Sequence, residues 1–232
     1  MKDKDEIKLI VGLLIKNEAD KYLKEVLDDI ATYADGFVVV DNGSVDNSAE
    51  ICLSYEKCLK VIIDTADWNT NETHLRKVLF NLACSFSPDW ILILDADEIL
   101  EKNFRQFLPG LMESKEYNWY GFTICHFWGS KTYYRIDKLW APHNSYIRMC
   151  RWLPKFNYLW PNYNIGNPLP MNVHQILNGK KTDIRIKHLA YSNTEDIKKR
   201  YDRYSTRPGD FHQKTHVESI LDKNIILRKW DD

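Results

Sequence analysis

Three acidic residues stand close together near the middle of the chain. Asp95, Asp97 and Glu98 follow directly on an apolar run, Trp90 to Leu94. Carboxylates at this spacing repel one another, each pair by about 1 to 4 kcal/mol at ~4 Å depending on the effective dielectric. A hard divalent cation offsets that repulsion, because Mn²⁺ or Mg²⁺ takes one or two carboxylates beside water and substrate phosphates. The spacing therefore favours a metal site over the alternative, a solvated acidic turn that begins a helix.

The roles of the three acids can be separated by the direction of their side chains. Residues two apart in an extended chain point the same way, so we expect Asp95 and Asp97 to face one crevice and Glu98 to point away from it. Asp97 is predicted to bind the metal, with Asp95 as a ribose contact or water-mediated ligand. Changing Asp97 to Asn is expected to relieve repulsion and leave folding intact.

A buried strand must present these acids. We interpret Trp90 to Leu94 as a strand covered on both faces, and the carboxyl ends of such strands form the ligand-binding crevice of open α/β sheets. Apolar runs that predict further strands precede it at Ile7 to Ile15, Phe37 to Val40 and Val61 to Ile63. Amphipathic stretches that predict helices lie between them at Asp20 to Tyr33, Ala49 to Lys57 and Glu72 to Ala83. This alternation predicts an α/β/α three-layer domain with a mostly parallel sheet and right-handed crossovers.

Aromatic residues dominate the second half of the chain. Of the 30 aromatic residues, 15 lie between Tyr117 and Tyr163. Most are expected in the core, and a few could stack against sugar rings. The expected elements here are a helix broken near Pro109 and Gly110 (Phe104 to Met112), strands at Phe122 to Phe127, Ser145 to Trp152 and Ile184 to Leu189, a loop at Pro154 to Pro170, and a basic helix at Glu195 to Tyr204. The basic residues of that last helix, Arg200 among them, favour a solvated face over a phosphate site.

The composition excludes several classes of protein. Lys and Arg number 32 against 33 Asp and Glu, a net charge of −1, so no global field favours nucleic acid or an anionic membrane. Five cysteines with no C-x-x-C spacing fit neither a disulfide framework nor a thiolate zinc site. The amino-terminal apolar stretch carries Lys8 and is too short to span a bilayer. We expect a cytoplasmic protein without a membrane span.

The order of the motifs resembles that of family 2 glycosyltransferases of the GT-A fold. The matching pieces are Asn17-Glu18 after the first strand, VDNGSVDNS at Val40 to Ser48, Arg76 before the fourth strand, and LDADE at Leu94 to Glu98. Val173-His174-Gln175 and Ile186 to Tyr191 are similar to later segments of that family. The resemblance implies one compact GT-A (Rossmann-like) domain, in which residues 1–115 bind the nucleotide sugar and residues 116–232 form an aromatic-rich acceptor half.

The resemblance also implies an activity. It is inverting, metal-dependent transfer of the hexosyltransferase type, with Mn²⁺ or Mg²⁺, from a nucleotide sugar to a saccharide, lipid-linked or protein acceptor. The nucleotide contacts that it implies are Asn17, Glu18, Asp41, Asn42, Arg76 and Asp95. The metal ligands that it implies are Asp97, Asp95 and His188.

Two departures from the family pattern affect these roles. Asn42 stands where the family more commonly has a second Asp. The resemblance therefore favours a UDP-sugar over other nucleotide sugars but does not require it. Gln175 replaces a Glu and cannot take the proton of the acceptor hydroxyl, a step for which inverting transfer needs a base. Asp137 and Asp183 are the available candidates for that base.

Two other functions compete with glycosyl transfer as interpretations of the D-x-D pair and the aromatic half. A D-x-D phosphohydrolase with Asp95 as nucleophile is disfavoured because three strands precede the pair and Ile99 stands where Thr or Val is expected. A carbohydrate-binding protein would leave the acids unexplained.

Overall fold

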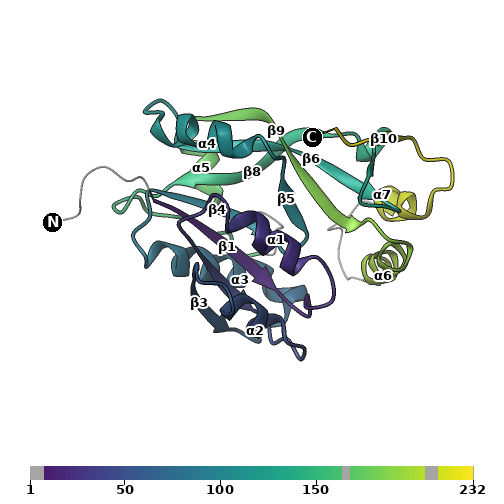
Figure 1. Ribbon diagram of the computed structural model, residues 1–232, viewed down its shortest axis with the longest axis horizontal. Coiled ribbons are helices and arrows are strands. Elements are labelled where there is room, and N and C mark those ends of the chain that lie inside the picture. The colour runs from purple at the N-terminus through teal and green to yellow at the C-terminus, as the bar shows by residue number, and fades with distance from the viewer. Residues whose placement is uncertain (1–7, 164–167, 207–213, 232) are drawn as a thin grey trace.

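The computed structural model describes residues 8–163, 168–206 and 214–231. Its strands are β1 (Leu9–Ile15), β2 (Gly36–Asp41), β3 (Cys58–Ile63), β4 (Trp90–Asp95), β5 (Glu98–Leu100), β6 (Trp119–Trp128), β7 (Tyr133–Arg135), β8 (His143–Arg151), β9 (Gly179–Tyr191) and β10 (Leu227–Lys229). Its α-helices are α1 (Leu23–Ile30), α2 (Ser48–Leu53), α3 (Trp68–Cys84), α4 (Phe104–Glu113), α5 (Met171–Ile176), α6 (Thr194–Ser205) and α7 (Lys214–Glu218), with short 3₁₀ turns η1 (Lys138–Trp140) and η2 (Ser219–Leu221). Figure 1 shows how these elements are arranged.

The first half of the sheet is parallel. Strands β3, β2, β1 and β4 lie side by side in that order, and all seven residues of β1 are buried. Gly12 allows the close packing of this sheet, because a Cβ there would stand 2.6 Å from a side-chain carbon of Ile93. The register pairs Leu14 with Asp95 and Ile15 with Asp41, so the polar residues after three strands meet at one edge. This part confirms the predicted α/β architecture.

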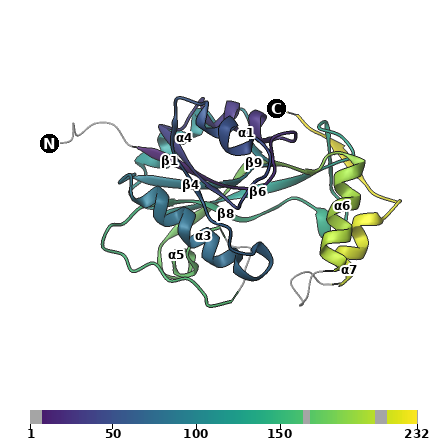
Figure 2. The ribbon, with the colours of Figure 1, turned by 90° about the horizontal axis from the view of Figure 1, so that it is seen from below.

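Helices cover both faces of the sheet, as Figure 2 shows, with α1 and α4 on one side and α3 and α5 on the other. Helix α1 buries the residues that its periodicity predicts, Leu23, Val26, Leu27 and Ile30. Helix α3 begins at an Asp67 cap, whose side chain accepts from the backbone N–H of Asn69, and buries an apolar face against β1 and β2. The predicted three-layer arrangement is confirmed.

The second half extends the same sheet with mixed pairing. Strand β8 pairs antiparallel with both β4 and β6, and β9 runs parallel to β6 and antiparallel to β5. One sheet therefore passes through both predicted halves of the domain. Many aromatic residues are core, as expected: Tyr120, Phe122 and Phe127 are buried within the sheet's core, and Trp128, Trp140 and Tyr191 form a small cluster beside α6 and η2.

Several boundaries differ from the sequence prediction. Helix α4 runs through Pro109, so the predicted break is wrong; Phe104, Leu108 and Met112 anchor one face of it in the core at four-residue spacing. Helix α2 ends at Leu53, four residues early, and β3 begins three residues early at Cys58. Ile7 and residues 164–167 of the predicted loop lie outside the described residues. Among the described helices, none combines the length and apolar character needed to cross a bilayer.

Candidate functional site

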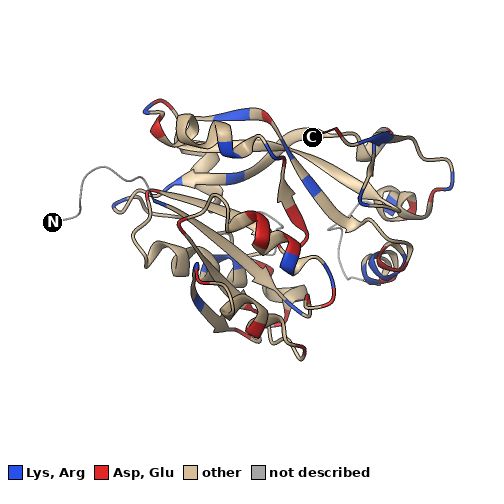
Figure 3. Ribbon diagram, viewed as in Figure 1, with Lys and Arg blue, Asp and Glu red and all other residues tan. Residues whose placement is uncertain are grey.

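The three acids lie where the chain leaves β4 and turns into β5, and Figure 3 shows acidic positions there near the middle of the ribbon. Asp95 ends β4, Ala96 and Asp97 form the turn, and Glu98 begins β5. All three acids line one cavity of about 680 Å³. The expectation that Glu98 points away is therefore wrong, because the chain turns immediately after Asp95 instead of remaining extended.

Three arginines neutralise the acids. Arg76 from α3 donates to Asp95 at 2.7 Å, and Arg148 from β8 donates to Asp95 at 3.1 Å and also to Glu98. Arg200 from α6 donates to Asp97 at 2.6 Å. The repulsion that the sequence predicts is thus offset by residues of the chain itself, and the interpretation of Arg200 as part of a solvated helix face is wrong.

The electrostatics of the acids differ with their partners. Burial opposes ionisation of Asp95, yet the charges of Arg76 and Arg148 hold its pKa well below the usual range. Burial raises the pKa of Asp97, and Arg200 opposes that rise only in part. Burial also raises the pKa of Glu98, against the charge of Arg148. Asp95 is therefore firmly an anion, with both oxygens engaged by arginines.

His188 lies beside Asp97. Its Nε2 is 3.7 Å from Asp97 Oδ1, while Asp97 Oδ2 accepts from Arg200. Burial lowers the pKa of His188 to about 3, so the imidazole is neutral and can offer a lone pair. Within residues 8–163, 168–206 and 214–231, no group of three or more His, Cys, Asp or Glu side chains is arranged to hold a metal. The carboxylate of Asp97 is the kind of ligand that Mn²⁺ or Mg²⁺ takes beside phosphates and water, and the neutral imidazole of His188 offers a nitrogen donor next to it.

The cavity has two further walls. On one side lie the end of β1 and the start of α3, with Ile15, Lys16, Asp67, Trp68 and Asn69. On the other side lie aromatic and imidazole groups from the second half of the chain: Trp140, Tyr146, Tyr191, Tyr204, His126, His143 and His216. We call the part lined by residues of β1 and α3 the polar end, the part lined by aromatic and imidazole groups the aromatic end, and the acids with their arginines the floor.

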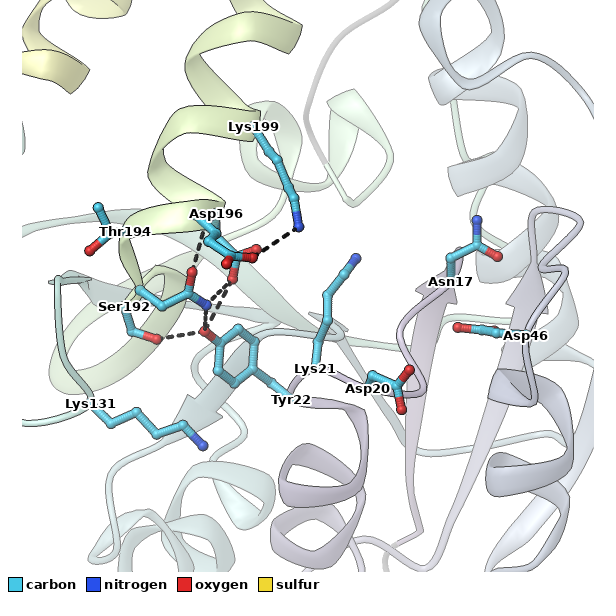
Figure 4. Close-up of a pocket in the computed structure, with 12 residues that line it drawn as sticks. Asn17, Asp20, Lys21, Tyr22, Asp46, Lys131, Ser192, Thr194, Asp196 and Lys199 are labelled. Atoms are coloured by element: carbon cyan, nitrogen blue, oxygen red, sulfur yellow. Dashed lines mark hydrogen bonds and ion pairs between the residues drawn. The ribbon is translucent and has the colours of Figure 1, made fainter.

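A second, larger pocket of about 790 Å³ lies next to this cavity and does not contain the acids (Figure 4). In it the Tyr22 hydroxyl contacts the Ser192 hydroxyl at 2.7 Å and receives a hydrogen bond from Asn193, which ties the start of α1 to the start of α6. Its lysines are paired with acids, as Lys21 is with Glu18. Of these two pockets, we place the chemistry in the cavity with the acids, because the buried Arg76 and Arg148 converge there on Asp95 and Glu98.

The structure brings together five of the residues predicted for the site: Glu18, Arg76, Asp95, Asp97 and His188 line the cavity. Asn17 lines the neighbouring pocket instead.

Asp41 and Asn42 are buried and do not line the cavity. The Asn42 amide donates to the backbone carbonyls of Asp64 and Ala66, and its oxygen accepts from Lys16. Asp41 accepts from the backbone N–H and hydroxyl of Ser44. Both residues shape the loops around the cavity.

Neither candidate base lies at the cavity. Both oxygens of Asp137 accept from the buried Arg135, at 2.8 Å each, and Asp183 is exposed on β9. Gln175 is exposed on α5. Sequence reasoning missed Arg148, His126, His143 and His216. Nothing in the local sequence marks them, because they reach the cavity through strand pairing and packing in the second half of the chain.

The sequence profile of the family described as Glycosyl transferase family 2 matches residues 11–176 of the 232. Two curated relatives, the uncharacterized proteins Mb3815c of Mycobacterium bovis and Rv3786c of Mycobacterium tuberculosis, are each 28% identical over 97 residues. That match covers 40% of this chain and 24% of each relative, so the chain spans only a small part of their length.

Among solved structures, residues 1-349 of S. aureus TarS superpose with a TM-score of 0.55 at 15% identity, covering 93% of this chain and 69% of that one. A second TarS structure gives a TM-score of 0.54 at 15% identity, covering 93% of this chain and 42% of that one. A glucosyl-3-phosphoglycerate synthase from Mycobacterium tuberculosis, solved with Mn²⁺ and UDP, reaches a TM-score of only 0.38 at 18% identity, over 51% of this chain and 43% of that one. The TarS superpositions show a fold of the GT-A type.

Proposed function

The chain belongs to glycosyl transferase family 2, and on that premise we propose that it is a glycosyltransferase that uses a UDP-sugar donor and one Mn²⁺ or Mg²⁺ ion. The observation that carries the proposal is the floor of the cavity. Asp97 and the neutral His188 lie side by side there at the carboxyl end of β4, and Arg200 donates to Asp97. The site of an open α/β sheet is expected at that end.

We assign the nucleoside to the polar end of the cavity, between the end of β1 and the start of α3. Trp68 offers an aromatic ring there, Asp67 and Asn69 offer polar groups, and Lys16 and Glu18 also line the cavity. Asp41 and Asn42 would contribute indirectly, through the loops that they hold. Asp95, held between two arginines, suits a ribose contact better than direct metal binding.

The diphosphate is assigned to the floor. Asp97 and His188 would hold the ion there, and a bound ion supplies Lewis-acid stabilisation of the charge on the leaving diphosphate. Arg200 adds a fixed positive charge at the same place, because its guanidinium already lies against Asp97. The family resemblance and this geometry both support these roles.

The acceptor is assigned to the aromatic end, where Trp140, Tyr146 and Tyr204 line the cavity. Partial desolvation lowers the pKa values of two imidazoles there, the exposed His143 and the half-buried His216, so both are neutral near pH 7. A neutral imidazole can accept the proton of an attacking hydroxyl. We assign the base to one of these two histidines, since Asp137 and Asp183 do not reach the cavity.

Thermal unfolding with UDP, GDP, ADP and TDP, each with and without Mn²⁺, tests the donor assignment. UDP with Mn²⁺ should raise Tm most, since a ligand at a hundredfold excess over Kd stabilises by about 2.7 kcal/mol. For a chain of this length that corresponds to about 5 to 11 °C. A larger shift with another nucleotide would contradict the uridine assignment, and equal shifts with and without Mn²⁺ would contradict the metal assignment.

A further inference from the structure

Two histidines meet at the floor of the cavity, the buried His126 and the partly exposed His188. His126 on β6 stands opposite His188 on β9 in the register of these parallel strands, and their Nδ1 atoms are 2.7 Å apart. Glu98 on β5 stands opposite His188 on the other side of β9. Residues opposite one another in paired strands project from the same face. The sheet therefore places Glu98, His188 and His126 in one row across three strands.

His126 is held in place independently of His188. Its side chain is only 9% exposed, and its ring meets that of Trp140 edge-on at 5.1 Å, with the planes at 90°. Trp140 is itself 1% exposed and donates from its indole nitrogen to the Ser219 hydroxyl at 2.9 Å. His126 thus offers His188 a partner whose position is fixed by packing.

A contact of 2.7 Å between two ring nitrogens is a hydrogen bond that holds one proton. A neutral imidazole carries its proton on one nitrogen only, so the two tautomers are linked. If His188 donates from Nδ1, its Nε2 faces Asp97 as a lone pair. If His126 donates instead, His188 carries its proton on Nε2, toward Asp97 Oδ1 at 3.7 Å.

We propose that His126 is a positioning residue that accepts the Nδ1 proton of His188 and thereby presents the Nε2 lone pair of His188 to a divalent cation beside Asp97. The inference rests on the proposed function, which makes Asp97 and His188 the metal ligands. Metal-binding histidines generally need such a partner on the other ring nitrogen, and losing it costs 10- to 100-fold in metal affinity. An imidazole partner differs from a carboxylate because it can also donate. When the ion leaves, the hydrogen bond between the two rings can therefore reverse its direction, with His126 as the donor.

Two substitutions of His126 separate this role from simple packing. His126→Asn places an amide oxygen near the position of Nδ1 and keeps an acceptor, whereas His126→Leu has similar bulk and no acceptor. Mn²⁺ binding is measured by the electron paramagnetic resonance signal of free Mn²⁺, alone and with UDP. We expect His126→Leu to weaken Mn²⁺ binding 10- to 100-fold and His126→Asn to stay close to wild type.

A double-mutant cycle shows whether His126 acts through His188. His126→Leu should cause no further loss in a His188→Ala background, because the coupled partner is already gone. An equal loss in both backgrounds, or wild-type Mn²⁺ affinity in folded His126→Leu, overturns the inference. If His188→Ala itself binds Mn²⁺ like wild type, the metal assignment of the proposed function fails as well. Weak binding by His188→Ala with unchanged binding by His126→Leu overturns the inference alone.

A measurement on the unmodified chain keeps the inference testable if His126→Leu does not fold. Nitrogen-15 chemical shifts of the histidine rings report which nitrogen carries the proton. With saturating Mg²⁺, His188 should be protonated on Nδ1 and His126 on Nε2. The opposite arrangement in the Mg²⁺-loaded protein would overturn the assignment.

Discussion

Replacing Asp97 by Asn tests the floor of the cavity most directly. Asn nearly keeps the shape of the side chain but removes the charge that faces Arg200 at 2.6 Å. The side chains of Asp97 and Arg200 are 13% and 25% exposed, so the loss of this charge-assisted hydrogen bond should cost about 1 to 3 kcal/mol. For this chain length Tm should fall by about 2 to 12 °C. The sequence-based expectation of relieved repulsion does not hold, because Arg200 already compensates Asp97.

The effect of Asp97→Asn on activity should be much larger than its effect on stability. If the carboxylate holds the ion that stabilises the leaving diphosphate, losing the carboxylate removes about 4 kcal/mol or more of transition-state stabilisation. At 1.36 kcal/mol per factor of ten, donor turnover should fall by about a thousandfold or more. The assay follows UDP release from UDP-sugars at saturating Mn²⁺, well below the Tm of the variant.

Glu101→Gln provides a matched control. Glu101 is buried, accepts from the Arg185 side chain at 2.8 Å, and does not line the cavity. The Glu101→Gln variant should lose about as much stability as Asp97→Asn and keep UDP release near that of the wild type. Wild-type turnover by folded Asp97→Asn at saturating Mn²⁺ would refute the reasoning about this turn, and an equal loss of turnover in Glu101→Gln would attribute the effect to destabilisation.

Three further predictions follow from the packing around the site. Asn42→Ala removes two hydrogen bonds to backbone carbonyls of the loop before α3 and should weaken UDP binding about tenfold by titration calorimetry; unchanged affinity would separate that loop from the nucleotide. Asp137→Asn removes the bidentate anion of the buried Arg135 and leaves it with the half-exposed Asp222 at 3.2 Å, so it should cost about 3 kcal/mol in urea unfolding. UDP release by the folded protein should not change, and loss of that release would restore Asp137 as a catalytic candidate. Burial lowers the pKa of His188 in the folded protein to about 3, whereas the unfolded chain takes up this proton below about pH 6.5. The free energy of unfolding should therefore fall by about 1 kcal/mol between pH 6.5 and 5.5. His188→Gln should remove that part of the fall.

The position of the acids could be predicted from the sequence because the signals are local. Apolar runs of strand length and amphipathic helical stretches alternate along residues 9–95, and each can be recognised within a short window. The acidic turn follows the last of these strands, so its place at the sheet edge follows from the alternation alone. The motifs in their order then indicated the family, which the profile match to residues 11–176 shows.

The partners of the acids could not be predicted in the same way. Arg148 is 53 residues from Asp95 in the sequence, and Arg200 is 103 residues from Asp97. His126 and His188 are 62 residues apart. No spacing rule connects positions this distant, and an arginine in a strand or on a basic helix has the same local pattern whether it faces solvent or a buried carboxylate.

The sequence by itself therefore determined the α/β alternation and the strand end that carries Asp95 and Asp97, because hydrophobic periodicity acts over a few neighbouring residues. Only the tertiary structure decided what surrounds them. The pairing of β8 with β4 brings Arg148 under the turn, and the pairing of β9 with β5 and β6 places His188 between Glu98 and His126. Those registers arise from the packing of the whole sheet, which forces distant charged groups together where burial makes an unpaired charge too costly to keep.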